Sequence, residues 1–163
     1  MKTAEDIIEA KGGNVVSVTP TTTIHAALKV MVENKIGAVL IVDEERIAGI
    51  WTERDLMRNT LTEWFNPKVA QIKNYMVSDV QFASHDDSIY DLMDKFLGLR
   101  LRHLPIERDG EFIGLLSIGD VLKACLHEKT LEFEKIYGMV SWDYYEEWKW
   151  ELDPEERKEV VGG

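Results

Sequence analysis

The sequence predicts an α/β (α+β) protein built from two copies of one strand–helix–strand–strand–helix unit, packed sheet to sheet. The apolar pattern of the first half returns in the second half at an offset of 65 positions. In each copy the last strand ends in the same kind of turn, at residues 49–55 and 114–120. A three-stranded unit with helices leaves one apolar face uncovered, and a second copy can cover that face. The pattern therefore predicts two pseudo-symmetric units.

A short helix is expected within residues 1–13. Ile7 and Ile8 stand there among acidic residues, and Gly12-Gly13 ends the pattern. We expect this lead-in helix to pack on the body of the protein.

The first unit covers residues 14–63. It begins with a β-rich run of valines, followed by a helix that three threonines can cap and whose apolar residues recur at helical spacing. Residues 36–42 form a continuous apolar block, which is typical of a strand buried on both faces. Residues 47–51 predict the next strand, and Thr52 opens the last helix of the unit.

The second unit, residues 79–128, repeats this order, and residues 64–78 connect the two. Identities between the units are few, but they fall on core and turn positions. The matched pairs include Val15 and Val80, Ile24 and Ile89, Ile41 and Ile106, Gly49 and Gly114, Thr52 and Ser117, and Asp55 and Asp120.

Residues 129–163 break the symmetry as a helical extension and an acidic, aromatic tail. The last helix is expected to continue well past the length of its first-unit counterpart, because steps of four and three residues join Ile118, Leu122, Cys125, Lys129, Phe133, Ile136 and Val140. Residues 141–150 combine aromatic and acidic side chains. We expect them to pack across a homodimer or onto the parent domain rather than to serve as a partner-recognition peptide.

Composition excludes several classes of function. The chain has 163 residues, a formal net charge of -11 and a pI near 4.8, which argues against binding to DNA or to an anionic membrane surface. The longest apolar block has seven residues, and the N-terminus has acids where a signal peptide is apolar, so neither a membrane span nor export is expected. Cys125 is the single cysteine, which indicates a reducing cytoplasm and no cysteine cluster for zinc.

The two turns each place a hydroxyl three residues before a carboxylate: Thr52 before Asp55, and Ser117 before Asp120. Such a pair can cap a helix, which contributes ~1 kcal/mol. Aspartate is shorter than the glutamate or glutamine that this box prefers, so we expect it to reach the cap amide less readily and to remain open to the two hydroxyls of a ribose. The helix N-terminus would favour the phosphate of the same ligand. From spacing alone, capping and ligand binding stand at even odds.

The tandem pattern resembles the CBS domain (cystathionine-β-synthase domain) over about residues 12–126. In the first unit the resemblance rests on residues 15–23, 36–43 and 49–55. In the second unit it rests on Arg102-His103-Leu104-Pro105-Ile106 and on residues 114–120. Paired units of this kind are called a Bateman module. The resemblance implies two clefts that bind adenosine ligands such as AMP, ADP, ATP, NAD or S-adenosylmethionine, in a regulatory homodimer.

Carried over by position, the resemblance implies two sets of binding residues. Cleft 2 would be formed by Asn14, Val16, Ile36, Gly37, Ala38, Arg102, His103, Ser117 and Asp120. Cleft 1 would be formed by Thr52, Arg54, Asp55, Asp79, Gln81 and Leu101, with Arg102 and His103.

Cleft 2 is expected to bind better. Val16 suits the face of an adenine, whereas Asp79 in cleft 1 would repel a phosphate, a repulsion that Arg54 can offset. His103 has two interpretations, a phosphate contact or, more commonly, a histidine satisfied within the core.

The predicted function is an adenine-nucleotide sensor that signals by conformational change in a homodimer and is read by an unknown regulated protein. AMP is the first choice of ligand, and ATP, ADP and NAD are the others. The alternative is an oligomerisation or partner-docking module whose clefts do not function. No enzyme activity and no metal are expected, because the sequence shows no nucleophile–base pair, metal cluster or glycine-rich phosphate loop.

Overall fold

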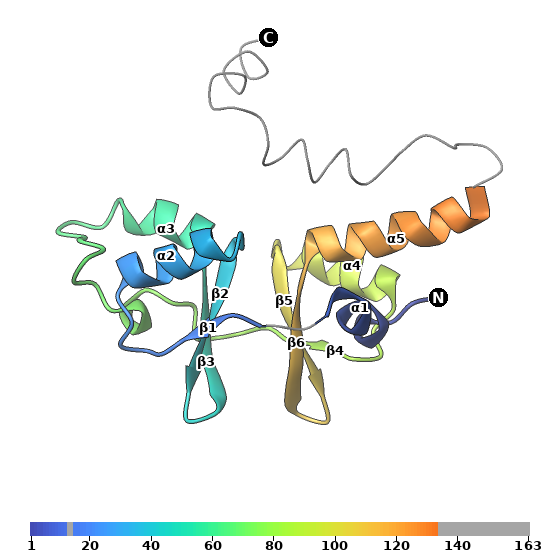
Figure 1. The fold of residues 1–163 in the computed structure, drawn as a ribbon, viewed down its shortest axis with the longest axis horizontal. Coiled ribbons are helices and arrows are strands. Elements are labelled where there is room, and N and C mark those ends of the chain that lie inside the picture. Colours follow the sequence, from blue (N-terminus) through green and yellow to red (C-terminus); the bar gives the residue numbers. More distant parts are fainter. Residues whose placement is uncertain (13–14, 134–163) are drawn as a thin grey trace, which may run out of the picture. The chain divides into compact units, whose positions relative to one another are not determined.

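The computed structural model describes residues 1–12 and 15–133 (Figure 1). Met1–Cys125 form one compact unit, and the last helix extends beyond it. In chain order the elements are α1 (Ala4–Lys11), β1 (Ser17–Val18), α2 (Ile24–Glu33), β2 (Ala38–Asp43), β3 (Arg46–Thr52), α3 (Glu53–Asn59), the 3-10 helix η1 (Ile72–Asn74), β4 (Ala83–Ser84), α4 (Ile89–Gly98), β5 (His103–Arg108), β6 (Glu111–Ser117) and α5 (Ile118–Phe133).

The strands form two three-stranded sheets, ordered β1-β2-β3 and β4-β5-β6. In each sheet the first pair is parallel and the second antiparallel. The registers are equivalent, because Ala38 pairs with Thr52 in one sheet and His103 pairs with Ser117 in the other. The predicted duplication and the predicted order of elements are confirmed.

The first strand of each unit is shorter than its apolar run suggested. β1 and β4 contain two residues each. Pro20 follows β1 closely, and a proline has no N–H to donate to a ladder. In the second unit Asp87 Oδ2 accepts a hydrogen bond from Ser84 N at 3.0 Å, which turns the chain after β4. These short strands lie at the edges of their sheets.

Each sheet has its own apolar core. In the first unit α2 buries Ile24, Ala27 and Met31 against β2 and β3, and Trp51 is fully buried among them. In the second unit α4 buries Ile89, Leu92 and Phe96. The connector joins the first core through Ile72, which is fully buried.

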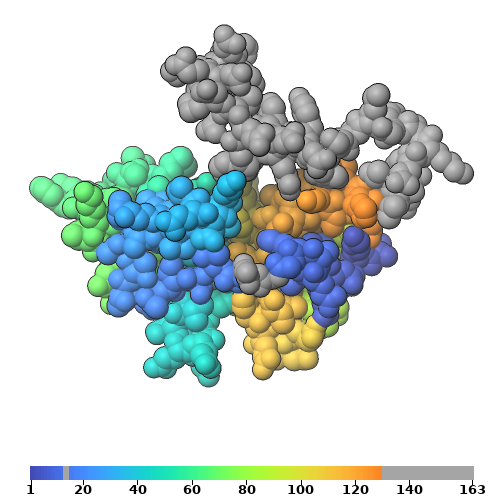
Figure 2. All heavy atoms as spheres, in the orientation of Figure 1, coloured from blue at the N-terminus to red at the C-terminus, as the bar shows by residue number. Residues whose placement is uncertain are grey.

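The lead-in helix α1 packs on the second unit. Ala4 and Ile7 belong to the second core, and Ala4 N donates to Asp87 O at 2.9 Å. A Cβ on Gly114 would lie 2.7 Å from Ile8 Cδ1, so only glycine allows this approach of α1 to β6. Figure 2 shows α1, in dark blue, against the yellow and orange second unit. The expected helix and its end at Gly12 are confirmed.

The last helix is longer than its counterpart, as expected. α5 has 16 residues and α3 has seven. The expected continuation to Val140 and the aromatic segment at 141–150 lie outside the described residues.

Candidate functional site

Ser117 ends β6, and Asp120 lies in the first turn of α5. The amide and the hydroxyl of Ser117 both donate to Asp120 Oδ2, at 2.7 and 2.8 Å. Asp120 N donates to Ser117 Oγ at 3.2 Å. The pair therefore forms the reciprocal bonds of a capping box. The expectation that an aspartate here reaches the cap amide poorly is wrong, because the carboxylate turns back and accepts that amide directly.

Thr52 and Asp55 form the same box at the start of α3. Thr52 N and Oγ1 donate to Asp55 Oδ2 at 2.9 and 3.0 Å, and Asp55 N donates to Thr52 Oγ1 at 3.3 Å. Asp55 is only 8% exposed, and its second oxygen, Oδ1, lies 3.6 Å from Arg58 Nη1. Capping therefore uses one oxygen of each carboxylate, and in Asp55 the other oxygen faces an arginine.

Lys11, the last residue of α1, reaches across to Asp120. Its Nζ donates to Asp120 Oδ2 at 2.8 Å and to Leu115 O at 3.1 Å. Oδ2 thus accepts from three donors, whereas Oδ1 accepts no hydrogen bond from the described residues. Burial acts to raise the pKa of Asp120, but the hydrogen bonds from Lys11 and Ser117 outweigh it and lower the pKa below its ordinary value. Asp120 is therefore a carboxylate at neutral pH.

His103 opens β5 directly opposite Ser117. Its Nδ1 is buried and has no hydrogen-bond partner among the described residues. Burial lowers the pKa of His103, and the charge of Lys11 lowers it further, while Asp120 and Glu53 act in the opposite direction. His103 is half-buried, and both interpretations of it, a phosphate contact and a satisfied core histidine, stay predictions.

The first-unit residues expected in cleft 2 lie around the start of β2. Val16 and Ile36 are half-buried and pack against the first core. Gly37 O accepts a hydrogen bond from Glu53 N at 3.0 Å, and Ala38 is buried. A Cβ on Gly37 would lie 3.1 Å from Glu53 Oε1, so the carboxylate of Glu53 lies against this glycine.

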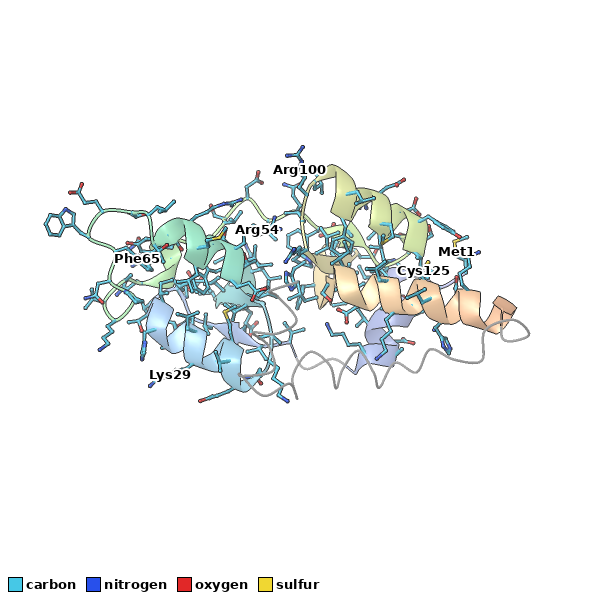
Figure 3. All side chains as sticks on the ribbon, turned by 90° about the horizontal axis from the view of Figure 1, so that it is seen from above. Met1, Lys29, Arg54, Phe65, Arg100 and Cys125 are labelled. Carbon is cyan, nitrogen blue, oxygen red and sulfur yellow. The ribbon has the colours of Figure 1, made fainter. Side chains whose placement is uncertain are left out.

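The residues expected in cleft 1 lie at the start of α3, in the loop before β5 and ahead of β4. Arg54 Nη1 donates to Arg100 O at 3.5 Å, which links α3 to the loop before β5 (Figure 3). Leu101 is half-buried against the second core. Asp79 and Gln81 are exposed before β4, and neither has a hydrogen bond to the Thr52–Asp55 turn in the described part of the chain.

Sequence reasoning missed two charged residues, Lys11 and Glu53. The signal for Lys11 was its place at the end of a helix just before Asn14, which was itself expected to contact a base. Glu53 lies inside the first Gly-to-Asp turn. Asn14 lies outside the described residues.

We call Lys11, Arg102, His103, Ser117 and Asp120 the Asp120 site.

Arg102 adds a second cation to the Asp120 site. It is exposed immediately before β5, and its carbonyl accepts a hydrogen bond from Ile118 N at 2.9 Å. The main chain of Arg102 is thereby bonded to Ile118, the first residue of α5. Val121, three residues further along the helix, is buried in the second core. An anion at the start of α5 would meet the helix N-terminus and the ammonium of Lys11.

Known proteins resemble this chain over most of its length. The mitochondrial CBS domain-containing protein CBSX3 of Arabidopsis thaliana is 27% identical over 151 residues, which cover 87% of this chain and 73% of that protein. A putative signal-transduction protein with CBS domains from Burkholderia ambifaria MC40-6 superposes with a TM-score of 0.76 at 31% identity, covering 86% of this chain and all (100%) of the other.

A second similar structure is that of CBSX2 in complex with AMP. It is 22% identical, covers 79% of this chain and 99% of its own, and has a TM-score of 0.63, which shows a shared fold. The family model for the CBS domain matches residues 3–61 and 70–127, one match for each unit. The chain therefore belongs to the CBS domain family.

Proposed function

We propose that this chain is an adenine-nucleotide-binding regulatory module and that the Asp120 site is its main binding site. AMP is the proposed ligand, with ATP, ADP and NAD as the other candidates. The observation that carries the proposal is the carboxylate of Asp120, which is ionised, is held at a helix start and keeps Oδ1 without a donor among the described residues. The AMP in the CBSX2 structure supports the choice of ligand.

The chemistry of the site suits a phosphorylated nucleoside. A ribose has two adjacent hydroxyls, which donate to a carboxylate, and the amides at the start of α5 favour a phosphate. The Asp55 site is proposed to bind more weakly, because Arg58 already faces Asp55 Oδ1 at 3.6 Å. We propose no catalytic role and no metal. Within the described residues, no group of three His, Cys, Asp or Glu side chains could hold a metal ion.

Thermal unfolding with added nucleotide tests the proposal. AMP, ADP, ATP and NAD should be titrated separately, and the binding ligand should raise the midpoint. At a ligand concentration 100 times the dissociation constant, binding stabilises the folded state by ~2.7 kcal/mol. If none of these ligands shifts the midpoint, the proposal is wrong.

A homodimer is the proposed signalling form, and its support is a duplicated apolar surface. Val32 on α2 and Leu97 on α4 occupy equivalent positions and are 76% and 66% exposed. Met57 on α3 and Leu122 on α5 are likewise equivalent, and they are 65% and 42% exposed. Large apolar side chains that recur at matched exposed positions indicate an interface rather than scattered exposure.

Leu97→Glu is expected to convert the dimer to a monomer, because the introduced carboxylate would be buried in the interface without a partner. Size-exclusion chromatography with light scattering measures the mass directly. The control is Val69→Glu, which places the same charge at a position in the connector that is 71% exposed. If both variants keep the mass of the parent protein, the proposed surface is not the interface.

The second candidate function, an assembly module without working ligand sites, is favoured by the same exposed side chains. Deleting residues 141–163 separates the two candidates. Loss of the dimer with nucleotide affinity intact would favour a structural role for the tail. In the described part of the chain, no helix is long and apolar enough to span a membrane. The cytoplasm stays our proposed location, on the evidence of the single cysteine.

A further inference from the structure

The bonding of Asp120 poses a problem for a ribose. A carboxylate oxygen has about two lone pairs, and Asp120 Oδ2 already accepts from Ser117 N, Ser117 Oγ and Lys11 Nζ. Two adjacent ribose hydroxyls need an acceptor each. Oδ1 can accept one of them, but Oδ2 can accept the other only if one of its present donors leaves.

Lys11 is the donor that can leave. The two bonds from Ser117 belong to the capping box that starts α5, and breaking them would leave the amide and the hydroxyl of Ser117 without their acceptor. Lys11, in contrast, has a side chain that is 44% exposed, and it is the last residue of α1, next to Gly12. Its long, flexible stem allows the ammonium to move without moving the helix.

Where the ammonium goes depends on the charge of the ligand. An uncharged nucleoside displaces the Lys11 ammonium from Asp120 Oδ2 but has no anionic group that the ammonium could bind. The ion pair is then lost without a replacement. A nucleotide brings a phosphate, and Lys11 can exchange the carboxylate for that phosphate at little net loss of charge pairing. Arg102, whose main-chain carbonyl is bonded to the first residue of α5, is the second cation proposed for the same phosphate.

We propose that Lys11 selects for phosphorylated ligands at the Asp120 site: its ammonium leaves Asp120 Oδ2 for the ligand phosphate, and a ribose hydroxyl takes the acceptor position that it leaves. This inference rests on the proposed nucleotide-binding function. It adds that the preferred ligand carries an anionic 5′ group, so that adenosine and other adenosine derivatives without a phosphate bind more weakly.

Calorimetric titration of AMP and of adenosine into the full chain tests the role of Lys11. In Lys11→Met, which keeps the length of the side chain and removes its charge, AMP affinity should fall about tenfold. Adenosine affinity should stay the same or rise, because Oδ2 no longer has a competing donor. Lys11→Arg should restore most of the preference for AMP. Lys29→Met is the matched control, because it removes one exposed lysine from α2 and should leave both affinities unchanged.

The possible results separate this inference from the proposed function. If the parent protein binds neither adenosine nor any of AMP, ADP, ATP and NAD, both the inference and the proposed function are wrong. If it binds them, but Lys11→Met leaves the ratio of the two affinities unchanged or weakens both equally, the role of Lys11 is wrong and the proposed function stands. A collapse of the ratio in Lys11→Met alone supports the exchange. Circular dichroism of each variant checks that the fold is intact.

Discussion

Replacing Trp51 with alanine is expected to lower the free energy of unfolding by about 3–5 kcal/mol. Trp51 is fully buried in the first core, and its Nε1 donates to Asn59 Oδ1 at 2.9 Å. The substitution therefore leaves a large cavity between β3 and the helices and also removes the donor that Asn59 accepts from. Urea unfolding followed by far-UV circular dichroism measures the loss.

Trp64→Ala is the control for this substitution. Trp64 is 92% exposed, so the same change of residue should alter the free energy of unfolding by no more than about 0.5 kcal/mol. Equal effects of the two substitutions would contradict the position of Trp51 in the core. Because each sheet has a separate core, unfolding of the Trp51→Ala variant is expected to begin in the first unit.

The repeat was predictable from the sequence because local patterns determine it. Apolar periodicity identified α2, β2 and β3, and the offset of 65 then placed α4, β5 and β6 in an equivalent register. A cap for α2 was also apparent locally, because three threonines directly precede the apolar helix, and Thr23 is the one that caps it.

The contacts of the Asp120 site were not predictable in the same way. Lys11 and Asp120 are 109 positions apart, and nothing in the local pattern shows that α1 packs on the second unit rather than the first. The sequence also did not decide whether the two aspartates cap a helix or bind a ligand, because a hydroxyl and an aspartate three residues apart suit both roles. The structure shows that one oxygen of each carboxylate caps its helix, and ligand binding by the second oxygen of Asp120 is our proposal.

Replacing Asp120 with alanine is expected to weaken AMP binding about 100-fold or more. The variant loses the acceptor for the ribose hydroxyls, and charged hydrogen bonds contribute about 1.5–3 kcal/mol each. The folded state should also lose about 1–2 kcal/mol, because the cap of α5 and the partly exposed pair with Lys11 both disappear. Calorimetry measures the affinity, and urea unfolding measures the stability.

The effect of a lost cap has to be separated from the effect of a lost ligand contact. Asp91 provides the control, because it forms the same capping box with Ser88 at the start of α4. Asp91→Ala should therefore remove a cap without changing the affinity for AMP. Asp55→Ala tests the weaker site and is expected to leave most of the AMP binding in place.

The most direct test of the central claim is calorimetric titration of AMP into the parent protein, Asp120→Ala and Asp91→Ala under one set of conditions. We predict that the parent protein and Asp91→Ala bind AMP with the same affinity and that Asp120→Ala binds AMP about 100-fold more weakly or worse. Equal binding by Asp120→Ala and the parent protein would contradict the claim that the Asp120 carboxylate binds the ribose.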